Sequence, residues 1–304
     1  MIGVFGHRGA RGLLPENTLA GMALAQRLGL TGVEFDIGMT ADGIAVVHHD
    51  PRPNPDIVRD ATGHYAGADA PFIRNLTFQQ LAAYDVGRLR AGSDYAARFV
   101  EQMPIEGARI PALAEALALC GPLDLFIEIK TYPDHLEATL EPKELVAAVA
   151  RALGEAGRIG KAVLFAFDWR VLEEAALREP ALRRCCLTAP ETVKRPDLWF
   201  GQTRLEAFGG SLPRAVASTG AVAWAPFHET LDEAGITEAR QLGLAVFTWT
   251  VNNATDIHRM IDLGVDGIIS DRPDRVAEIC SARGIEVATP GVDFNRILCS
   301  RKKP

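Results

Sequence analysis

Apolar runs typical of buried strands alternate with helix-like segments through most of this chain. Beyond Pro111 the strand candidates are 123–129, 162–167, 184–188, 221–225, 244–250 and 267–270. Between them lie segments whose apolar residues are spaced as on one face of a helix, such as 144–156, 171–178 and 255–263. This alternation predicts a parallel sheet covered by helices.

The first fifty residues add two strands to this series, 3–7 and 32–37. A helix-like segment at 19–26 separates them, with Asn17 or Thr18 available to cap its first turn. Eight strands is the number that closes a (β/α)₈ or TIM barrel. An open doubly wound sheet is the alternative, but its Gly-x-Gly-x-x-Gly signature does not follow the first strand. The sequence therefore predicts an α/β fold of the TIM-barrel type.

A less regular region interrupts the barrel pattern after the second strand. A short apolar run at 44–48 is followed by prolines and polar residues over 51–107, with only a helical piece at 77–84. Long irregular regions in compact domains are usually binding loops or lids. We expect a single catalytic domain over 1–284, in which about 51–107 is a lid-like insertion, and a C-terminal extension over 285–304.

The composition narrows the partners and the compartment. The 304 residues, 48% of them hydrophobic, are enough for one large core. The net charge of −7 argues against a nucleic-acid partner, and the basic run from Arg301 to Lys303 is interpreted as a solvated terminus. The chain contains no run of about 20 apolar residues, so no transmembrane span is predicted. Five scattered cysteines are expected to be reduced and buried, which favours the cytoplasm: Cys120, Cys185, Cys186, Cys280 and Cys299.

Polar side chains cluster where the predicted strands end. Read toward the carboxyl ends, they are His7 and Arg8, Glu34 and Asp36, His48, His49 and Asp50, Glu128 and Lys130, and Trp249. Active sites of TIM barrels lie at the carboxyl ends of the strands. The sequence therefore predicts that these side chains share one pocket. Asp168, Asn252 and Asp271 also follow strands, but we do not expect them to be catalytic.

Several of these residues belong to short motifs that occur in order along nearly the whole chain. The motifs are His7-Arg8-Gly9 with Pro15-Glu16-Asn17-Thr18, Glu34-Phe35-Asp36, His49-Asp50, Ile127-Glu128-Ile129-Lys130, Phe167-Asp168-Trp169, Trp249-Thr250-Val251-Asn252 and Asp266-Gly267-Ile268-Ile269-Ser270-Asp271. Together they resemble the glycerophosphodiester phosphodiesterase family, whose members are (β/α)₈ barrels. The resemblance implies metal-dependent hydrolysis of a small glycerophosphodiester to an alcohol and glycerol 3-phosphate.

Three carboxylates form a candidate metal site. Glu34 and Asp36 stand two residues apart in a strand and therefore point to the same side. With Glu128 they offer only oxygen, which selects hard cations such as Mg²⁺ or Ca²⁺. The family resemblance implies the same three residues as metal ligands. The alternative is that these carboxylates simply pair with Arg8 and Lys130.

His7 and His49 are the candidate acid and base, because imidazole titrates nearest neutral pH and can fill either role. They also resemble the family's catalytic histidines. Which of the two is the acid and which the base is left open by the sequence. His48 precedes His49 in a strand and so points to the opposite side, where we expect it to pack or to support its neighbours.

The remaining candidates concern substrate binding. Arg8 is the candidate phosphate clamp, because a planar guanidinium can hold two phosphate oxygens. Lys130 shares a strand face with Glu128 and would place an ammonium beside the metal. Trp249 is expected to line the pocket against the alcohol portion of the substrate. The residues expected to orient the others are Glu16, Asn17 and Asp50.

Two other functions are compatible with the sequence. The same barrel could act on lysophospholipids or phosphoinositides if the insertion supplied an apolar entrance, for which the candidates are Phe72, Ile73, Phe78 and Phe99. The barrel could also bind phosphate without catalysis, although binding alone does not require both His7 and His49. The sequence determines neither the alcohol group nor the oligomeric state.

Overall fold

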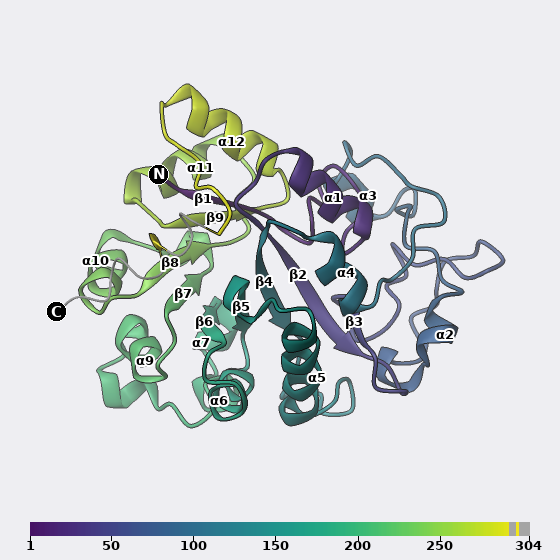
Figure 1. The fold of residues 1–304 in the computed structure, drawn as a ribbon, viewed down its shortest axis with the longest axis horizontal. Helices are drawn as coiled ribbons and strands as arrows, with labels where there is room; N and C mark the ends of the chain where they lie inside the picture. The colour runs from purple at the N-terminus through teal and green to yellow at the C-terminus, as the bar shows by residue number, and fades with distance from the viewer. Residues whose placement is uncertain (292–295, 298–304) are drawn as a thin grey trace.

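The structure, a computed structural model, describes residues 1–291 and 296–297. In this part of the chain, eight parallel strands follow one another around a barrel, and the last of them pairs with the first (Figure 1). They are β1 (Gly3–Gly6), β2 (Gly32–Met39), β4 (Asp124–Ile129), β5 (Ala162–Ala166), β6 (Arg183–Thr188), β7 (Ala223–Pro226), β8 (Ala245–Thr248) and β9 (Gly267–Ser270). Strand β3 (Ala45–Val47) runs antiparallel to β2. The predicted TIM barrel is confirmed.

Helices follow the strands and cover the outside of the barrel (Figure 1). The longer ones are α1 (Leu19–Arg27), α4 (Leu113–Leu119), α5 (Pro142–Glu155), α6 (Trp169–Arg178), α9 (Leu212–Ser218), α10 (Glu233–Gln241), α11 (Ala254–Leu263) and α12 (Pro273–Ala282). Shorter helices are α2 (Phe78–Leu81), α3 (Asp94–Arg98), α7 (Pro190–Val193) and α8 (Pro196–Trp199). Single 3₁₀ turns are η1 (Ile73–Asn75), η2 (Ile159–Lys161), η3 (Leu205–Phe208) and η4 (His228–Thr230).

The helix predicted at 77–84 is shorter in the structure. Thr77 caps it, but the helix ends at Leu81. Soon afterwards the chain becomes extended, since the backbones of Asp85 and Arg59 exchange two hydrogen bonds of 2.8 Å. This pairing within the insertion overrides the local helical pattern.

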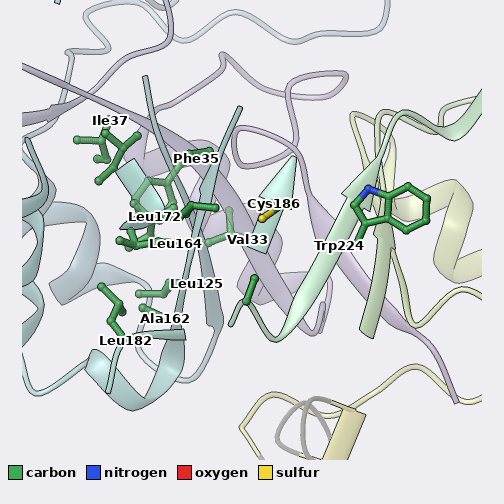
Figure 2. Close-up of a cluster of buried hydrophobic side chains, with 14 of the residues drawn as sticks. Val33, Phe35, Ile37, Leu125, Ala162, Leu164, Leu172, Leu182, Cys186 and Trp224 are labelled. Atoms are coloured by element: carbon green, nitrogen blue, oxygen red, sulfur yellow. The ribbon is translucent and has the colours of Figure 1, made fainter. Parts of the chain in front are cut away.

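The pleat of strand β2 decides which side chains reach the site. Val33, Phe35 and Ile37 pack into the large hydrophobic cluster between the sheet and the helices (Figure 2). Because side chains alternate along a strand, Glu34 and Asp36 point to the other side, into the barrel. Burial of the three apolar neighbours therefore fixes the direction of the two carboxylates.

Phenylalanine rings fill the inside of the barrel below the carboxyl ends of the strands. Phe126 stacks on Phe5 and Phe165, with centroid separations of 4.0 and 4.3 Å, and meets Phe247 edge-on at 4.9 Å. Gly32 makes room for this layer, because a Cβ atom there would lie 2.7 Å from the Phe5 ring. The rings form a solid apolar floor under the polar strand ends.

The insertion has a hydrophobic core of its own and lies beside β3 and α1 on one side of the barrel (Figure 1). Ile73 and Phe99 belong to this core and are only 3% and 9% exposed. Phe72 and Phe78 are half-buried. Ile73 and Phe99 therefore do not supply the exposed apolar entrance for which they were candidates.

The segment after α12 closes the amino-terminal end of the barrel. Val287 pairs with Ile2, and the backbone N–H of Gly291 donates to Asp124 at 2.6 Å. Ala288 belongs to the cluster inside the barrel. The first residues of the predicted C-terminal extension thus pack against the barrel, while 292–295 and 298–304 lie outside the described residues.

The described cysteines are free and buried, as predicted: Cys120, Cys185, Cys186 and Cys280. Cys299 and the basic run from Arg301 to Lys303 lie outside the described residues. Among the helices that the structure describes, none has both the length and the apolar character needed to cross a bilayer.

Asp124 is expected to make the protein less stable as the pH rises from about 4 to 6. Burial raises the pKa of this carboxyl from 3.8 to about 6, so in this range the folded chain holds a proton that the unfolded chain has lost. The free energy of unfolding then falls with increasing pH. Asp124→Asn keeps an oxygen for the Gly291 N–H and should raise stability above pH 6 by on the order of 2 kcal/mol.

Urea unfolding of both proteins at pH 4.5 and pH 7.5 checks this expectation. The midpoint of the variant should exceed that of the wild type at the higher pH and approach it at the lower. Midpoints that differ equally at both pH values would contradict a buried, titrating Asp124.

Candidate active site

The carboxyl ends of the first barrel strands bring five predicted residues to one cavity. His7 follows β1, Glu34 lies in β2, and Glu128 with Lys130 comes from the end of β4. His49 reaches the same cavity from the chain that follows β3. The cavity has a volume of about 150 Å³. The predicted convergence of these side chains is therefore observed.

Glu34, Asp36 and Glu128 bring carboxylate oxygens within 4.8 Å of one another. Register explains this, since Asp36 pairs directly with Glu128 across β2 and β4. Glu34 Oε1 and Asp36 Oδ1 are buried and accept no hydrogen bond within the described part of the chain. Burial raises the pKa of Glu34 well above its usual range, and the charges of Asp36 and Glu128 raise it further. Buried oxygens of this kind fit a hard divalent cation such as Mg²⁺ or Ca²⁺.

Two cations keep part of this cluster ionised. Burial opposes the charge on Asp36, but Arg8 Nε at 3.2 Å and Lys130 Nζ at 3.4 Å hold the pKa of Asp36 well below its usual range. Burial likewise raises the pKa of Glu128, and Lys130, which donates to it at 2.6 Å, acts in the opposite direction. The alternative pairing with Arg8 and Lys130 thus exists, but it leaves Glu34 Oε1 without a hydrogen-bond donor.

His7 is held by a carboxylate that comes from the other end of the chain. Its Nδ1 lies 2.6 Å from Asp271 Oδ1, and its Nε2 is 3.7 Å from Glu34 Oε2. Burial, together with the charge of Arg11, lowers the pKa of His7 to about 4. A neutral imidazole that donates from Nδ1 to Asp271 leaves the Nε2 lone pair directed toward the carboxylates and the cavity.

His49 is arranged in the same way by its neighbour in sequence. Its Nδ1 lies 2.7 Å from Asp50 Oδ1, and Asn54 donates to the other oxygen of Asp50 at 2.6 Å. Burial, then Arg8 and Lys130, lowers the pKa of His49 to about 4. Asp50 therefore contacts the imidazole that it is predicted to orient.

His48 points away from this cavity. Its Nε2 lies 3.4 Å from the carbonyl oxygen of Arg52, and His48 lines a second, smaller pocket that Met39 and Ile73 also border. The predicted difference between His48 and His49 is thus visible in the structure.

Arg8 occupies a tight turn at the end of β1. Its φ is +51°, and Gly9 follows at +92°, where a Cβ atom would lie 2.9 Å from the backbone of Gly21. This conformation lets the Arg8 N–H donate to Glu34 Oε2 at 3.0 Å. The guanidinium donates to Glu16 Oε1 at 2.9 Å and also borders the cavity. The turn therefore places Arg8 beside both the carboxylates and the cavity.

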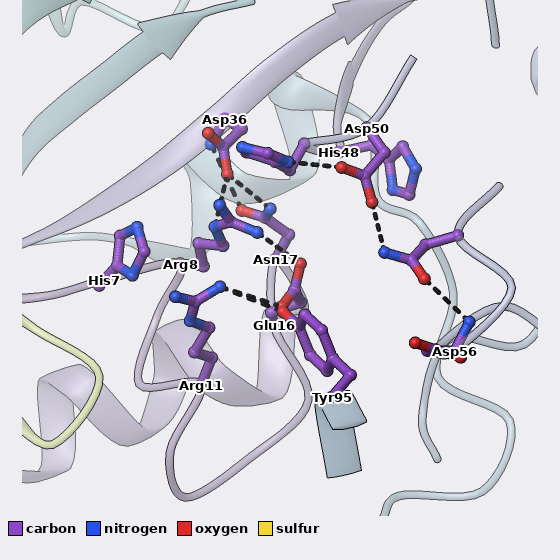
Figure 3. A network of polar contacts seen from close by, with 12 residues as sticks. His7, Arg8, Arg11, Glu16, Asn17, Asp36, His48, Asp50, Asp56 and Tyr95 are labelled. Atoms are coloured by element: carbon purple, nitrogen blue, oxygen red, sulfur yellow. Dashed lines mark hydrogen bonds and ion pairs between the residues drawn. The ribbon is translucent and has the colours of Figure 1, made fainter. Parts of the chain in front are cut away.

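The other predicted supporting residue, Asn17, also contacts the site. Its Nδ2 donates to Asp36 Oδ2 at 2.9 Å, and its φ of +54° places it in the left-handed region (Figure 3). Asn17 thus holds Asp36 while Thr18, its neighbour, caps helix α1.

Trp249 forms one apolar wall of the cavity. Its Nε1 donates to the carbonyl of Ala225 at 3.0 Å, which fixes the indole. The ring meets Phe167 edge-on, with a centroid separation of 5.2 Å. Phe165 and Leu187 complete this wall. The cavity is therefore polar at the carboxylates and apolar opposite them.

Three residues of the site were missed or set aside at the sequence level. Asp271 follows β9 and was not expected to be catalytic, and the structure places it in contact with His7. Arg11 contacts Asp271 at 2.6 Å and lies four residues after His7, in no recognised motif. Tyr95 comes from the irregular insertion and donates to Glu16 (Figure 3). Only Asp271 carried a signal, its position at a strand end.

The sequence profile of the Glycerophosphoryl diester phosphodiesterase family matches residues 7–275. The chain belongs to this family. It is 28% identical to a glycerophosphodiester phosphodiesterase of Caldanaerobacter subterraneus subsp. tengcongensis, over 92% of this chain and 98% of that protein. It is 27% identical to one from Bacillus subtilis, over 88% of this chain and 83% of that protein.

Solved structures of the family have the same barrel. A Silicibacter pomeroyi protein assigned to the family shares 36% of its residues with this chain, covers 94% of this chain and 95% of its own, and superimposes with a TM-score of 0.86. A phosphodiesterase from Oleispira antarctica, 21% identical with a TM-score of 0.67 over 92% and 96% of the two chains, shares the fold. The family resemblance and the phosphodiesterase activity inferred from the motifs are confirmed.

Proposed function

We propose that this family member hydrolyses small glycerophosphodiesters with a divalent cation and two histidines, releasing an alcohol and glycerol 3-phosphate. The observation that carries the proposal is the set of three carboxylates beside one cavity, two of which have buried oxygens that accept no hydrogen bond in the described structure. The Oleispira antarctica relative was crystallised with its product sn-glycerol-3-phosphate, which supports the expected product.

Glu34, Asp36 and Glu128 would hold the cation. When bound, it would polarise the phosphate and lower the pKa of the attacking hydroxyl. Mg²⁺ and Ca²⁺ both suit a set of oxygen ligands. The charge of the three carboxylates would then be balanced, which would remove the mutual repulsion that adds to burial in raising the pKa of Glu34.

His7 and His49 would move the protons. Each has its Nδ1 hydrogen-bonded to an aspartate, Asp271 or Asp50, so each presents Nε2 for the reaction. One histidine accepts the proton of the nucleophile, which is water or the glycerol hydroxyl of the substrate. The other, in its doubly protonated form, donates its Nε2 proton to the leaving alcohol.

Arg8 and Lys130 would bind the phosphate. Both are buried, border the cavity and lie next to the carboxylates, so their charge acts where dielectric screening is weak. The apolar wall formed by Trp249 and Phe167 would contact the carbon atoms of the alcohol.

The insertion would act as a lid, and the protein would work in the cytoplasm. Tyr95 of the insertion reaches Glu16 beside Arg8, which supports the first role. The free, buried cysteines support the second. A lysophospholipid or phosphoinositide substrate is less well supported, because Ile73 and Phe99 are buried.

A substrate panel distinguishes these functions. Glycerophosphocholine and glycerophosphoethanolamine should be hydrolysed, and long-chain lysophosphatidylcholine should have a kcat/KM lower by about tenfold or more. The physical reason is that the apolar lining of the cavity is short, so most of a long acyl chain would remain in water. Glycerol 3-phosphate release is measured with a coupled assay.

Equal or faster hydrolysis of the lysophospholipid would favour the lipid-directed function. Tight binding of glycerophosphocholine without turnover in Mg²⁺, Ca²⁺ or Mn²⁺ would favour a non-catalytic barrel. Either result would overturn the proposed substrate class or reaction.

A further inference from the structure

Arg11 joins the carboxylate of Asp271, which holds His7, to the carboxylate of Glu16, which holds Arg8. Figure 3 shows the Arg11 side chain directed toward Glu16. Its Nε donates to Asp271 Oδ1 at 2.6 Å, the same oxygen that contacts His7 Nδ1. Its Nη1 lies 3.8 Å from Glu16 Oε2, while the other oxygen of Glu16 accepts a hydrogen bond from Arg8. Arg11 therefore links Asp271, which contacts His7, to Glu16, which contacts Arg8.

The insertion holds the guanidinium of Arg11 in place. The Tyr95 hydroxyl accepts from Arg11 Nη1 at 3.1 Å and donates to Glu16. The Phe99 ring lies against the guanidinium, with 4.8 Å between Cζ and the ring centroid. Both aromatic residues are at most 9% exposed. Arg11 is therefore fixed by contacts from helix α3 and the residue that follows it.

Asp271 is a buried carboxylate that accepts hydrogen bonds from Arg11 and Asn252. Its Oδ2 accepts from Asn252 Nδ2 at 2.8 Å, but Arg11 is the cation that the structure places against it. Loss of that cation would leave a buried carboxylate with an unbalanced charge, which favours a different side-chain position. Because His7 is hydrogen-bonded to Asp271, its imidazole would shift with it, and small displacements of a reacting group are costly.

We propose that Arg11 is a positioning residue that, together with Tyr95 and Phe99 of the insertion, keeps Asp271 and therefore His7 in the geometry the reaction requires. The inference rests on the proposed role of His7. The competing role for Arg11 is direct contact with the substrate, because its side chain also borders the cavity.

A double-mutant cycle of Arg11→Gln and Asp271→Asn separates the two roles. In the wild-type background, Arg11→Gln should lower kcat by about 10- to 100-fold and change KM by less than about 3-fold. In the Asp271→Asn background, the same substitution should change kcat by less than about 3-fold, because the path through Asp271 is already broken. Steady-state kinetics with glycerophosphocholine and saturating cation give both values.

Two results of the cycle would overturn the proposal. One is a rise in KM with kcat retained in Arg11→Gln, and the other is an undiminished loss of kcat in the Asp271→Asn background. Each indicates that Arg11 touches the substrate.

Tyr95→Phe tests the contribution of the insertion without disturbing its core. The ring remains, and only the hydroxyl that joins Arg11 to Glu16 is removed. The variant should lose kcat in the same direction as Arg11→Gln, by up to about tenfold. A wild-type kcat for Tyr95→Phe would overturn the role assigned to the insertion.

Arg98→Gln is the matched control. Its exposed guanidinium lies 4.7 Å from the Tyr95 ring centroid and 5.8 Å from that of Phe99, so it contacts the same rings from another side. The kcat should stay within about 2-fold of wild type. A loss as large as that of Arg11→Gln would assign the effect to loosened ring packing and overturn the proposal.

Failure of this inference can be told apart from failure of the proposed function. A His7→Ala enzyme that remains active refutes the catalytic role of His7 itself. An inactive His7→Ala enzyme, with an Arg11→Gln effect that persists in the Asp271→Asn background, refutes only the positioning role of Arg11.

Discussion

The His7→Ala enzyme is expected to show a kcat about 10²- to 10⁴-fold below that of the wild type, with a much smaller change in KM. The reason is that Asp271 holds Nδ1 of His7 at 2.6 Å, so Nε2 is the atom placed to move a proton. His49→Ala should give a loss of the same order, because Asp50 orients that imidazole in the same way at 2.7 Å. Steady-state hydrolysis of glycerophosphocholine at saturating cation measures both.

His228→Ala is the control for removal of a buried imidazole. His228 is 6% exposed, close to the 9% of His7, and it follows strand β7 without lining the cavity. Its kcat should stay near that of the wild type. Near wild-type hydrolysis by either His7→Ala or His49→Ala would show that the acid and base are assigned to the wrong residues.

Chelation of the divalent cation is expected to abolish hydrolysis. Glu34→Gln is expected to lower kcat by about 10³-fold or more, even when the cation is restored. The reason is that stabilisation of the transition state by a metal ion supplies several kcal/mol. Glu34 is chosen because its Oε1 is buried and accepts no hydrogen bond within the described structure. Its pKa is raised well above the usual range by burial and by Asp36 and Glu128, so the folded chain without a cation favours the neutral form. Neutral glutamine should therefore fold well and bind no cation.

Thermal unfolding gives a readout that does not depend on activity. Addition of Mg²⁺ or Ca²⁺ should raise the Tm of the wild type, because a ligand that binds only the folded state stabilises it, and should leave the Tm of Glu34→Gln unchanged. Glu174→Gln is the control, since Glu174 pairs with Arg178 on the outer helix α6. A Glu34→Gln protein with a cation-dependent rise in Tm would contradict the metal site.

The sequence predicted the parts of the site that strand periodicity encodes. In β2, the apolar Val33, Phe35 and Ile37 alternate with Glu34 and Asp36, and this pattern alone placed both carboxylates on one side of the strand. The same reasoning separated His49 from His48. These predictions succeeded because the direction of a side chain depends on local backbone geometry.

The insertion marks the limit of such patterns. Phe99 was a candidate for an apolar entrance under the alternative lipid-directed function, whereas the structure packs it into a separate core and against Arg11. No motif or periodic pattern in the sequence pointed to Tyr95, although its hydroxyl donates to Glu16. Without a regular period, composition shows that residues are apolar but not which surface they cover.

The sequence by itself thus determined the barrel class, the carboxylates, the histidines and the strand ends that carry them. Only the tertiary structure decided which partners reach them from distant strands. His7 meets Asp271, 264 residues away, because β9 pairs with β1 when the barrel closes, and Glu128 meets Asp36 because β4 pairs with β2 in that register. The physical reason is that periodicity fixes the direction of a side chain along its own strand, whereas its partners depend on strand order and register over the whole chain.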